Sequence, residues 1–139
     1  MTRTATCQCR AFRAVAEGEP DIVNVCHCHA CQRRTGTPFS VNAYFRKEAV
    51  RLEGEYRSYS RDAREGRTLT NHFCPECGAT VCWTMDMRPG HYGIAVGAFN
   101  DPSFPPPTFS VWEEAMHGWV TLPPDMQHFR QARPVPGSA

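Results

Sequence analysis

The sequence predicts an all-β fold of short antiparallel strands, with zinc knuckles and one short helix. Short segments rich in β-branched and aromatic residues alternate with turn residues along the chain. The 139 residues include 10 glycines and 12 prolines, which break the chain into short elements. Seven of the eight cysteines fall into three close-spaced clusters, as metal-binding knuckles require.

The predicted elements follow one another with short turns between them. Residues 12–17 and 22–25 read as two strands joined across a Gly-Glu-Pro turn, and we expect them to form a hairpin. Residues 29–37 are polar and helix-compatible, and Gly36 and Pro38 would end a short helix there. Further strands are expected, largely as an antiparallel meander, at residues 41–45, 50–53, 56–60, 68–73, 79–83, 91–99 and 109–112.

Length and composition favour one zinc-binding domain over residues 1–133, because 41% hydrophobic residues in a chain of this length suit a single modest core. Residues 134–139 read as a flexible tail. Residues 1–10 lack the apolar stretch of a signal peptide, and no run approaches the ~18 apolar residues of a membrane span. We therefore expect a soluble, cytoplasmic protein without a membrane partner.

The charge of the chain disfavours nucleic-acid binding. The formal net charge of +1 counts every cysteine as neutral, but metal ligands are thiolates. Seven thiolates lower the charge by seven and two zinc ions raise it by four, which gives −2 for the metallated chain. A general nucleic-acid binder needs a basic face, so no nucleic-acid partner is expected.

The cysteine spacing indicates metal binding, because cysteines separated by one or two residues rarely reach disulfide geometry. Metal-binding thiols in place of disulfides favour a reducing compartment. Residues 74–78, Cys-Pro-Glu-Cys-Gly, form the strongest signal: proline rigidifies the turn and Gly78 permits a positive φ that turns backbone N–H groups toward the sulfurs. Two further thiolates must complete this knuckle. Spacing alone allows them to come from the cluster at Cys7 and Cys9 or from the cluster at residues 26–31.

If Cys7 and Cys9 complete the knuckle, none of the clustered cysteines is left without a metal site, and we prefer this assignment. A zinc ion with four thiolates is closed and structural, whereas three protein ligands leave a position open for water or substrate. The three remaining cysteines, Cys26, Cys28 and Cys31, would then hold a Lewis-acidic zinc ion. Alternatively, His27 or His29 fills the fourth position and closes the centre, or hydrogen-bonds a sulfur from outside the coordination shell.

Several residues outside these clusters also bear on the candidate site. Arg33 and Arg34 follow Cys31 and could bind a substrate carboxylate, or simply offset the negative charge of the thiolates. Cys82 lies in a strand pattern and is expected to be a buried, inert thiol. Five large aromatic residues are expected in the core rather than in a pocket: Trp83, Tyr92, Phe99, Trp112 and Trp119. Four histidines show no partner in the sequence and receive no role: His72, His91, His117 and His128.

Two motifs together resemble the glutathione-dependent formaldehyde-activating enzyme family. They are Cys-His-Cys-His-Ala-Cys-Gln-Arg-Arg-Thr-Gly at residues 26–36 and Phe-Cys-Pro-Glu-Cys-Gly at residues 73–78. That family also includes centromere protein V and has the Mss4-like β-tent fold. The likeness continues through residues 96–102 and the region of Trp112 and Trp119. The family usually has Gly-Gly before the first cysteine and Gly after the second, where this chain has Ala5-Thr6 and Arg10. The resemblance implies a structural zinc ion on Cys7, Cys9, Cys74 and Cys77 and a catalytic one on Cys26, Cys28 and Cys31.

The activity implied by the resemblance is that of a carbon–sulfur lyase similar to S-hydroxymethylglutathione synthase. Such an enzyme adds glutathione or a related thiol to formaldehyde or a small aldehyde, and it also cleaves the adduct. We expect two Zn²⁺ per chain, the second more labile because three thiolates hold it, and small-molecule partners. The proton donor is not identified, and His27 and His29 are candidates only by proximity. The alternative is a zinc-stabilised protein-binding module without catalysis.

Overall fold

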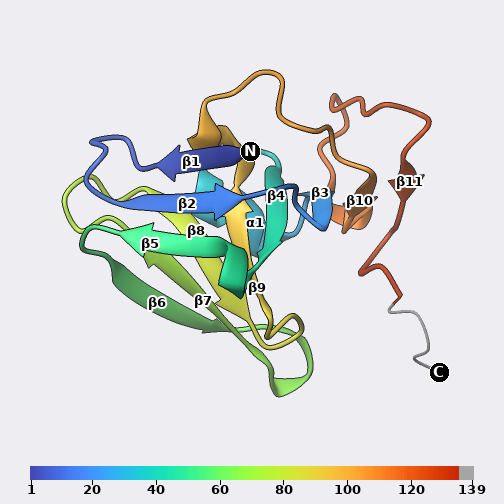
Figure 1. Ribbon diagram of the computed structural model, residues 1–139. Coiled ribbons are helices and arrows are strands. Elements are labelled where there is room, and N and C mark those ends of the chain that lie inside the picture. The colour runs from blue at the N-terminus through green and yellow to red at the C-terminus, as the bar shows by residue number, and fades with distance from the viewer. Residues whose placement is uncertain (135–139) are drawn as a thin grey trace. The chain divides into compact units, whose positions relative to one another are not determined.

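The computed structural model describes residues 1–134 and divides into two compact units. Unit 1 contains Met1–Ile22 and Asn42–Phe104, and unit 2 contains Val23–Val41 and the chain from Pro105 onward. Figure 1 shows the elements along the chain. Apart from Pro134, the predicted tail at residues 134–139 lies outside the described residues.

Unit 1 is built from two antiparallel sheets. The small sheet has the order β1 (Thr2–Thr6), β2 (Arg13–Glu17) and β5 (Val50–Glu53). The larger sheet has the order β4 (Ser40–Arg46), β9 (His91–Ala95), β8 (Thr80–Met85), β7 (Thr68–Phe73) and β6 (Arg57–Asp62). The short 3-10 helices η1 (Lys47–Ala49) and η2 (Arg64–Gly66) connect strands of this unit, and a third, η3 (Val96–Phe99), follows β9.

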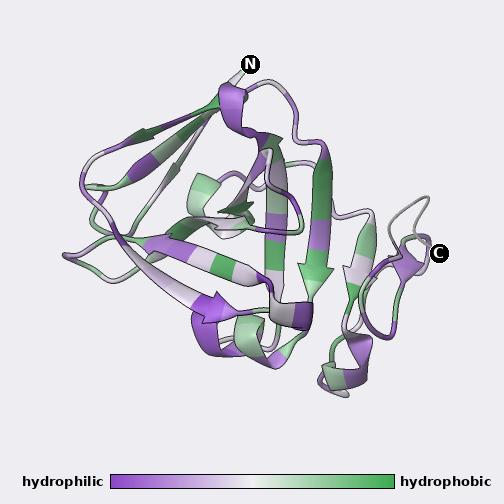
Figure 2. Cartoon of the chain, turned by 90° about the horizontal axis from the view of Figure 1, so that it is seen from below, coloured by the Kyte–Doolittle hydropathy of each residue, from purple (hydrophilic) through white to green (hydrophobic). Residues whose placement is uncertain are grey.

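The core of unit 1 follows from the alternation of buried and exposed positions along these strands, which Figure 2 shows as alternating hydrophobic and hydrophilic bands. In β7, for example, Leu69 and Asn71 are buried and their neighbours are partly exposed. Rings fill the interior, and those of Phe99 and Phe104 stack at 4.8 Å between centroids. The largest side chains of unit 1 that are fully buried are Phe12, Phe45, Ile94, Val81, Cys74 and Cys82.

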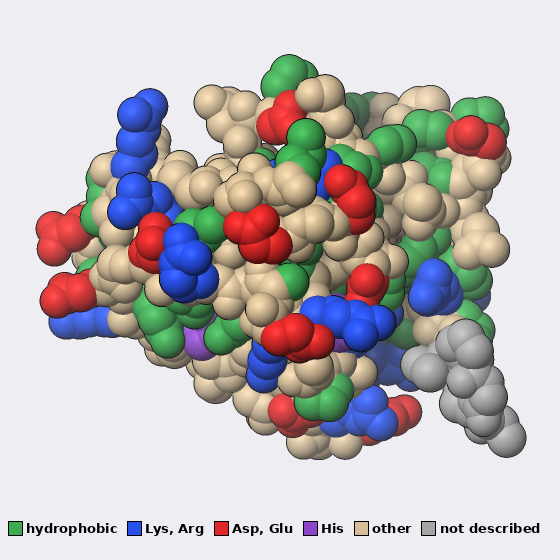
Figure 3. Space-filling model, viewed as in Figure 1, with side chains coloured by type: hydrophobic (Ala, Val, Ile, Leu, Met, Phe, Trp, Pro, Cys, Tyr) green, Lys and Arg blue, Asp and Glu red, His purple; other side chains and the backbone are tan. Residues whose placement is uncertain are grey.

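Charged side chains of both signs are interspersed on the face shown in Figure 3. They pair locally, as Arg51 does with Glu53 at 3.1 Å. Exposed pairs of this kind contribute little to stability, about 0–1 kcal/mol each. They form an ordinary solvated surface.

Unit 2 contains the α-helix α1 (His29–Thr35) and strands with parallel neighbours. β10 (Phe109–Val111) pairs in parallel with both β3 (Ile22–Cys26) and β11 (Gln127–His128), and the 3-10 helix η4 (Glu113–Ala115) follows β10. The predicted helix is thus confirmed. It ends at Gly36, whose φ of 70° is left-handed and whose N–H donates to the Gln32 carbonyl at 2.8 Å.

The hairpin predicted for residues 12–17 and 22–25 is wrong. β2 has β1 on one side and β5 on the other, so neither of its edges is free for β3. The reason is that β1, Thr-Arg-Thr-Ala-Thr, has almost no hydrophobic residues, so the residue pattern gives no sign of the strand that pairs with β2. β3 instead pairs with β10, which lies more than 80 residues later in the sequence.

The all-β, Mss4-like fold class with one short helix is confirmed by the observed elements and by the cysteine clusters that connect them. Within the described part of the chain, no helix is both long and apolar enough to cross a membrane.

Candidate metal centres

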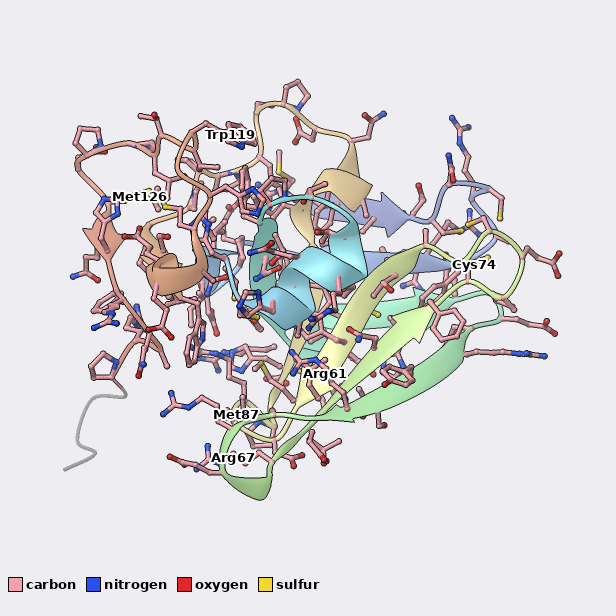
Figure 4. All side chains as sticks on the ribbon, turned by 180° about the vertical axis from the view of Figure 1, so that it is seen from behind. Arg61, Arg67, Cys74, Met87, Trp119 and Met126 are labelled. Atoms are coloured by element: carbon pink, nitrogen blue, oxygen red, sulfur yellow. The ribbon has the colours of Figure 1, made fainter. Side chains whose placement is uncertain are left out.

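Four cysteines from two segments of unit 1 that are far apart in the sequence come together in space. Cys7 and Cys9 follow β1, and Cys74 and Cys77 lie between β7 and β8, where Figure 4 labels Cys74. Their four Sγ atoms all lie within 4.8 Å of one another, with Cys7–Cys9 at 3.7 Å and Cys9–Cys74 at 3.6 Å. Tetrahedral zinc with Zn–S bonds of about 2.3 Å separates its sulfurs by about 3.8 Å. The four-cysteine group therefore fits zinc.

The backbone around this group is shaped for thiolates. Phe12 N–H donates to Cys7 Sγ at 3.2 Å and Glu76 N–H to Cys74 Sγ at 3.4 Å. Gly78 has the predicted positive φ, 77°, and its N–H donates to the Cys74 carbonyl at 2.9 Å. Backbone hydrogen bonds from Ala79 and Cys9 lower the pKa of Cys77 to about 6. A thiol with this pKa is largely deprotonated at neutral pH, which is the form that binds metal.

The first knuckle keeps its shape without the glycine that the family usually has after the second cysteine. Arg10 occupies that position with a φ of 69°, which is left-handed, and its N–H donates to the Cys7 carbonyl at 3.0 Å. Left-handed backbone costs a residue with a side chain about 1–2 kcal/mol. The turn is therefore retained at an energetic cost.

We expect Arg10→Gly to stabilise the protein by about 1 kcal/mol, because glycine adopts this φ freely and only part of that gain is lost to the greater freedom of the unfolded chain. The change is measured as the free energy of unfolding in urea. Gln8→Gly is the matched control, since Gln8 lies in the same exposed turn and is not among the residues with positive φ. Gln8→Gly should give no stabilisation, and equal stabilisation by both variants would contradict the explanation.

A second sulfur group lies in unit 2, where β3 meets α1. Cys26 is the last residue of β3, Cys28 is the N-cap of α1, and Cys31 lies in the first turn of the helix. Their Sγ atoms lie within 4.8 Å of one another, and Cys31 N–H donates to Cys28 Sγ at 3.4 Å. Within residues 1–134, no histidine nitrogen or carboxylate oxygen joins this three-cysteine group at that distance. It can hold zinc through three thiolates.

The two neighbouring histidines lie outside this group. His27 is fully buried: its N–H donates to the Val111 carbonyl at 3.1 Å, and Nε2 lies 3.0 Å from Ser110 Oγ. Its Nδ1 is buried without a hydrogen-bond partner among the described residues. Burial lowers the pKa of His27, so its imidazole is neutral. His29 is exposed at the start of α1.

The pKa values of the three thiols are shifted in different directions. Hydrogen bonds from Cys26 and Cys28 lower the pKa of Cys31, and the Ser40 hydroxyl and the Arg34 guanidinium lower it further. The pKa of Cys26 is raised, first by its hydrogen bond with Cys28. Arg34 therefore acts on the sulfurs, whereas Arg33 is exposed on the helix.

Gln32 links the three-cysteine group to a distant segment. Its Nε2 donates to the His27 carbonyl at 2.8 Å and to the Ala115 carbonyl at 3.1 Å, and its Oε1 lies 3.1 Å from His117 Nε2. Gln32, Ser40, Ser110 and His117 were not identified from the sequence. Ser110, Ala115 and His117 are 83 to 85 residues from their partners, and no local spacing signals such contacts.

The remaining candidates are placed as follows. Cys82 is buried in β8 outside both groups, and burial raises its pKa to about 12. Trp83 and Phe99 are buried, as predicted, and Tyr92 and Trp112 are half-buried. The core prediction is wrong for Trp119, which is 71% exposed because it follows η4 in a surface loop.

Comparisons with known proteins found one family and a similar solved structure. A family model described as glutathione-dependent formaldehyde-activating enzyme matches residues 2–115, a range that includes both cysteine groups. The crystal structure of a Rhodobacter sphaeroides protein, a structural genomics target, has a similar fold, with a TM-score of 0.54 and 23% sequence identity. The match covers 71% of this chain and 91% of that one. No curated protein matches.

Proposed function

Because the chain belongs to the glutathione-dependent formaldehyde-activating enzyme family, we propose that it is a zinc-dependent carbon–sulfur lyase. In this proposal it adds glutathione or a related thiol to formaldehyde or a small aldehyde and cleaves the adduct in reverse. The observation that carries the proposal is the contrast between the two sulfur groups: one offers four thiolates, and the other offers three with no fourth ligand among residues 1–134.

The residues divide into a scaffold and a reaction centre. Cys7, Cys9, Cys74 and Cys77 would hold the structural ion, and Cys26, Cys28 and Cys31 the catalytic one. Zinc bound by three thiolates would supply Lewis acidity, which favours ionisation of a thiol or polarises an aldehyde oxygen. β3 and α1 carry the three sulfurs on short, hydrogen-bonded backbone, and the buried His27 between Cys26 and Cys28 is held by Ser110 and Val111.

Arg33 and Arg34 are proposed to have different roles, one toward the thiol substrate and one toward the metal ligands. Arg33 is exposed and can form paired hydrogen bonds with a glutathione carboxylate. Arg34 acts on Cys31, where its charge offsets part of the negative charge of the sulfurs. A co-substrate held by Arg33 would thus lie on the solvent side of α1.

We expect two zinc ions per chain after purification under reducing conditions without chelator, and mild chelation should remove one before the other. Three thiolates bind zinc less securely than four, and two of the three, Cys28 and Cys31, are only half-buried. Elemental analysis before and after chelation measures this. Two ions that resist chelation equally would contradict an open site and favour the alternative of a protein-binding module.

A further inference from the structure

The side-chain amide of Gln32 has only one orientation that satisfies its surroundings. Two of its three neighbours, the carbonyls of His27 and Ala115, are acceptors only. The NH₂ group must therefore face both, and this places Oε1 toward His117. The reversed amide would set an oxygen against two carbonyl oxygens.

This orientation fixes the tautomer of His117. Oε1 of Gln32 can only accept a hydrogen bond, so Nε2 of His117 must carry the hydrogen that it donates at 3.1 Å. In the neutral ring, Nδ1 is then unprotonated and has a free lone pair. The His117 side chain is exposed, and no hydrogen bond to Nδ1 is found among the described residues.

The position of His117 relates it to the three-cysteine group. Gln32 follows Cys31 directly, and its amide holds the carbonyl of His27, the residue between Cys26 and Cys28. His117 is hydrogen-bonded to the Gln32 side chain and lies at the surface of the same unit. A histidine with a fixed tautomer and an accessible lone pair is suited to proton transfer.

We propose that His117 is the proton carrier of the three-cysteine site. This inference rests on the proposed function and supplies the acid–base group that the sequence did not identify. His117 lies two residues beyond the range that the family model matches. Its assignment comes from the contacts with Gln32 alone.

In the forward direction, Nδ1 of His117 takes the proton from the thiol of the co-substrate. The sulfur electron pair forms the new C–S bond with the aldehyde carbon, and the π electrons of the C=O bond move to its oxygen. That oxygen then takes the proton back from Nδ1. The thiol and aldehyde become a hydroxyalkyl thioether, His117 returns to its starting form, and cleavage is the same sequence reversed.

The test uses His117→Gln in the metal-loaded protein with glutathione and formaldehyde as substrates. Glutamine can still donate an N–H to Gln32 but cannot carry a proton, so we expect the enzymatic exchange rate between free and adduct forms, measured by exchange NMR, to fall about 100-fold or more. Zinc content should be unchanged. His91→Gln is the control, since His91 bonds Asp21 in unit 1, and it should keep the wild-type rate. An unchanged rate in His117→Gln would overturn the proposal.

A second measurement needs neither turnover nor a variant. Long-range ¹H–¹⁵N NMR of the wild-type protein at alkaline pH should show His117 with its hydrogen on Nε2. Finding the hydrogen on Nδ1 would overturn the proposal even if His117→Gln failed to fold. If wild-type protein did not accelerate the exchange at all, the proposed function would fail and His117 would lose its catalytic role with it. If wild-type protein accelerated the exchange and His117→Gln did so equally, the role of His117 would be wrong but the proposed function would stand.

Discussion

Cys77→Ser is expected to unfold unit 1. The four-cysteine group joins the turn after β1 to the turn between β7 and β8, so one bound ion connects segments about 65 residues apart in the sequence. Structural zinc contributes about 10–16 kcal/mol of apparent binding free energy in zinc-finger peptides, which is comparable to the ~5–15 kcal/mol stability of a whole domain. Replacing one thiolate by a hydroxyl removes much of this, because serine is a poor ligand for zinc.

The loss is measured by the dispersion of the amide NMR spectrum and by zinc content. Cys82→Ala is the control, since Cys82 is a buried cysteine of the same unit that lies outside both sulfur groups. It removes one buried sulfur atom, should cost about 1–2 kcal/mol, and should leave the protein folded with both ions. A folded Cys77→Ser protein with two ions would show that the four-cysteine group is not the scaffold.

The sequence predicted those parts of the fold in which local pattern and tertiary structure agree. The strands at 50–53, 68–73 and 109–112 are found within a residue of their expected ends, because β-branched and aromatic residues are bounded there by turn residues. Strand pairing was harder to predict. The polar β1 occupies an edge of β2 that was assigned to β3, and the parallel pairing of β3 with β10 depends on segments far apart in the sequence.

A similar division holds for the candidate site. In the structure, seven sulfur atoms form one group of four and one of three. Each knuckle is local in the sequence, but spacing alone does not decide which knuckles share a metal ion. The surroundings of the three-cysteine group were not predictable. Ser110 in β10 contacts His27, and His117, two residues after η4, contacts Gln32; both contacts join residues more than 80 positions apart in the sequence. The position of Arg10 also shows that a missing glycine need not change a turn.

Cys28→Ser is expected to abolish turnover while leaving the fold intact. Cys28 is the N-cap of α1, and its Sγ accepts a hydrogen bond from Cys31 N–H. Serine is among the preferred N-cap residues and would accept the same bond through Oγ. α1 has seven residues and none is fully buried, so little of the core depends on it. With two thiolates left in the group, zinc content should fall from two ions to one.

Exchange NMR with glutathione and formaldehyde should then show only the uncatalysed rate, and the thermal midpoint of unfolding should change by a few degrees at most. Cys82→Ala should retain both the rate and the two ions, since its thiol takes no part in either sulfur group. Retained turnover in Cys28→Ser would show that the three-cysteine group is not the reaction centre. A global loss of structure in Cys28→Ser would instead show that the second ion is structural. If the wild-type protein also showed no turnover, the protein-binding module would be the better description, because the three-cysteine group would then serve folding and not catalysis.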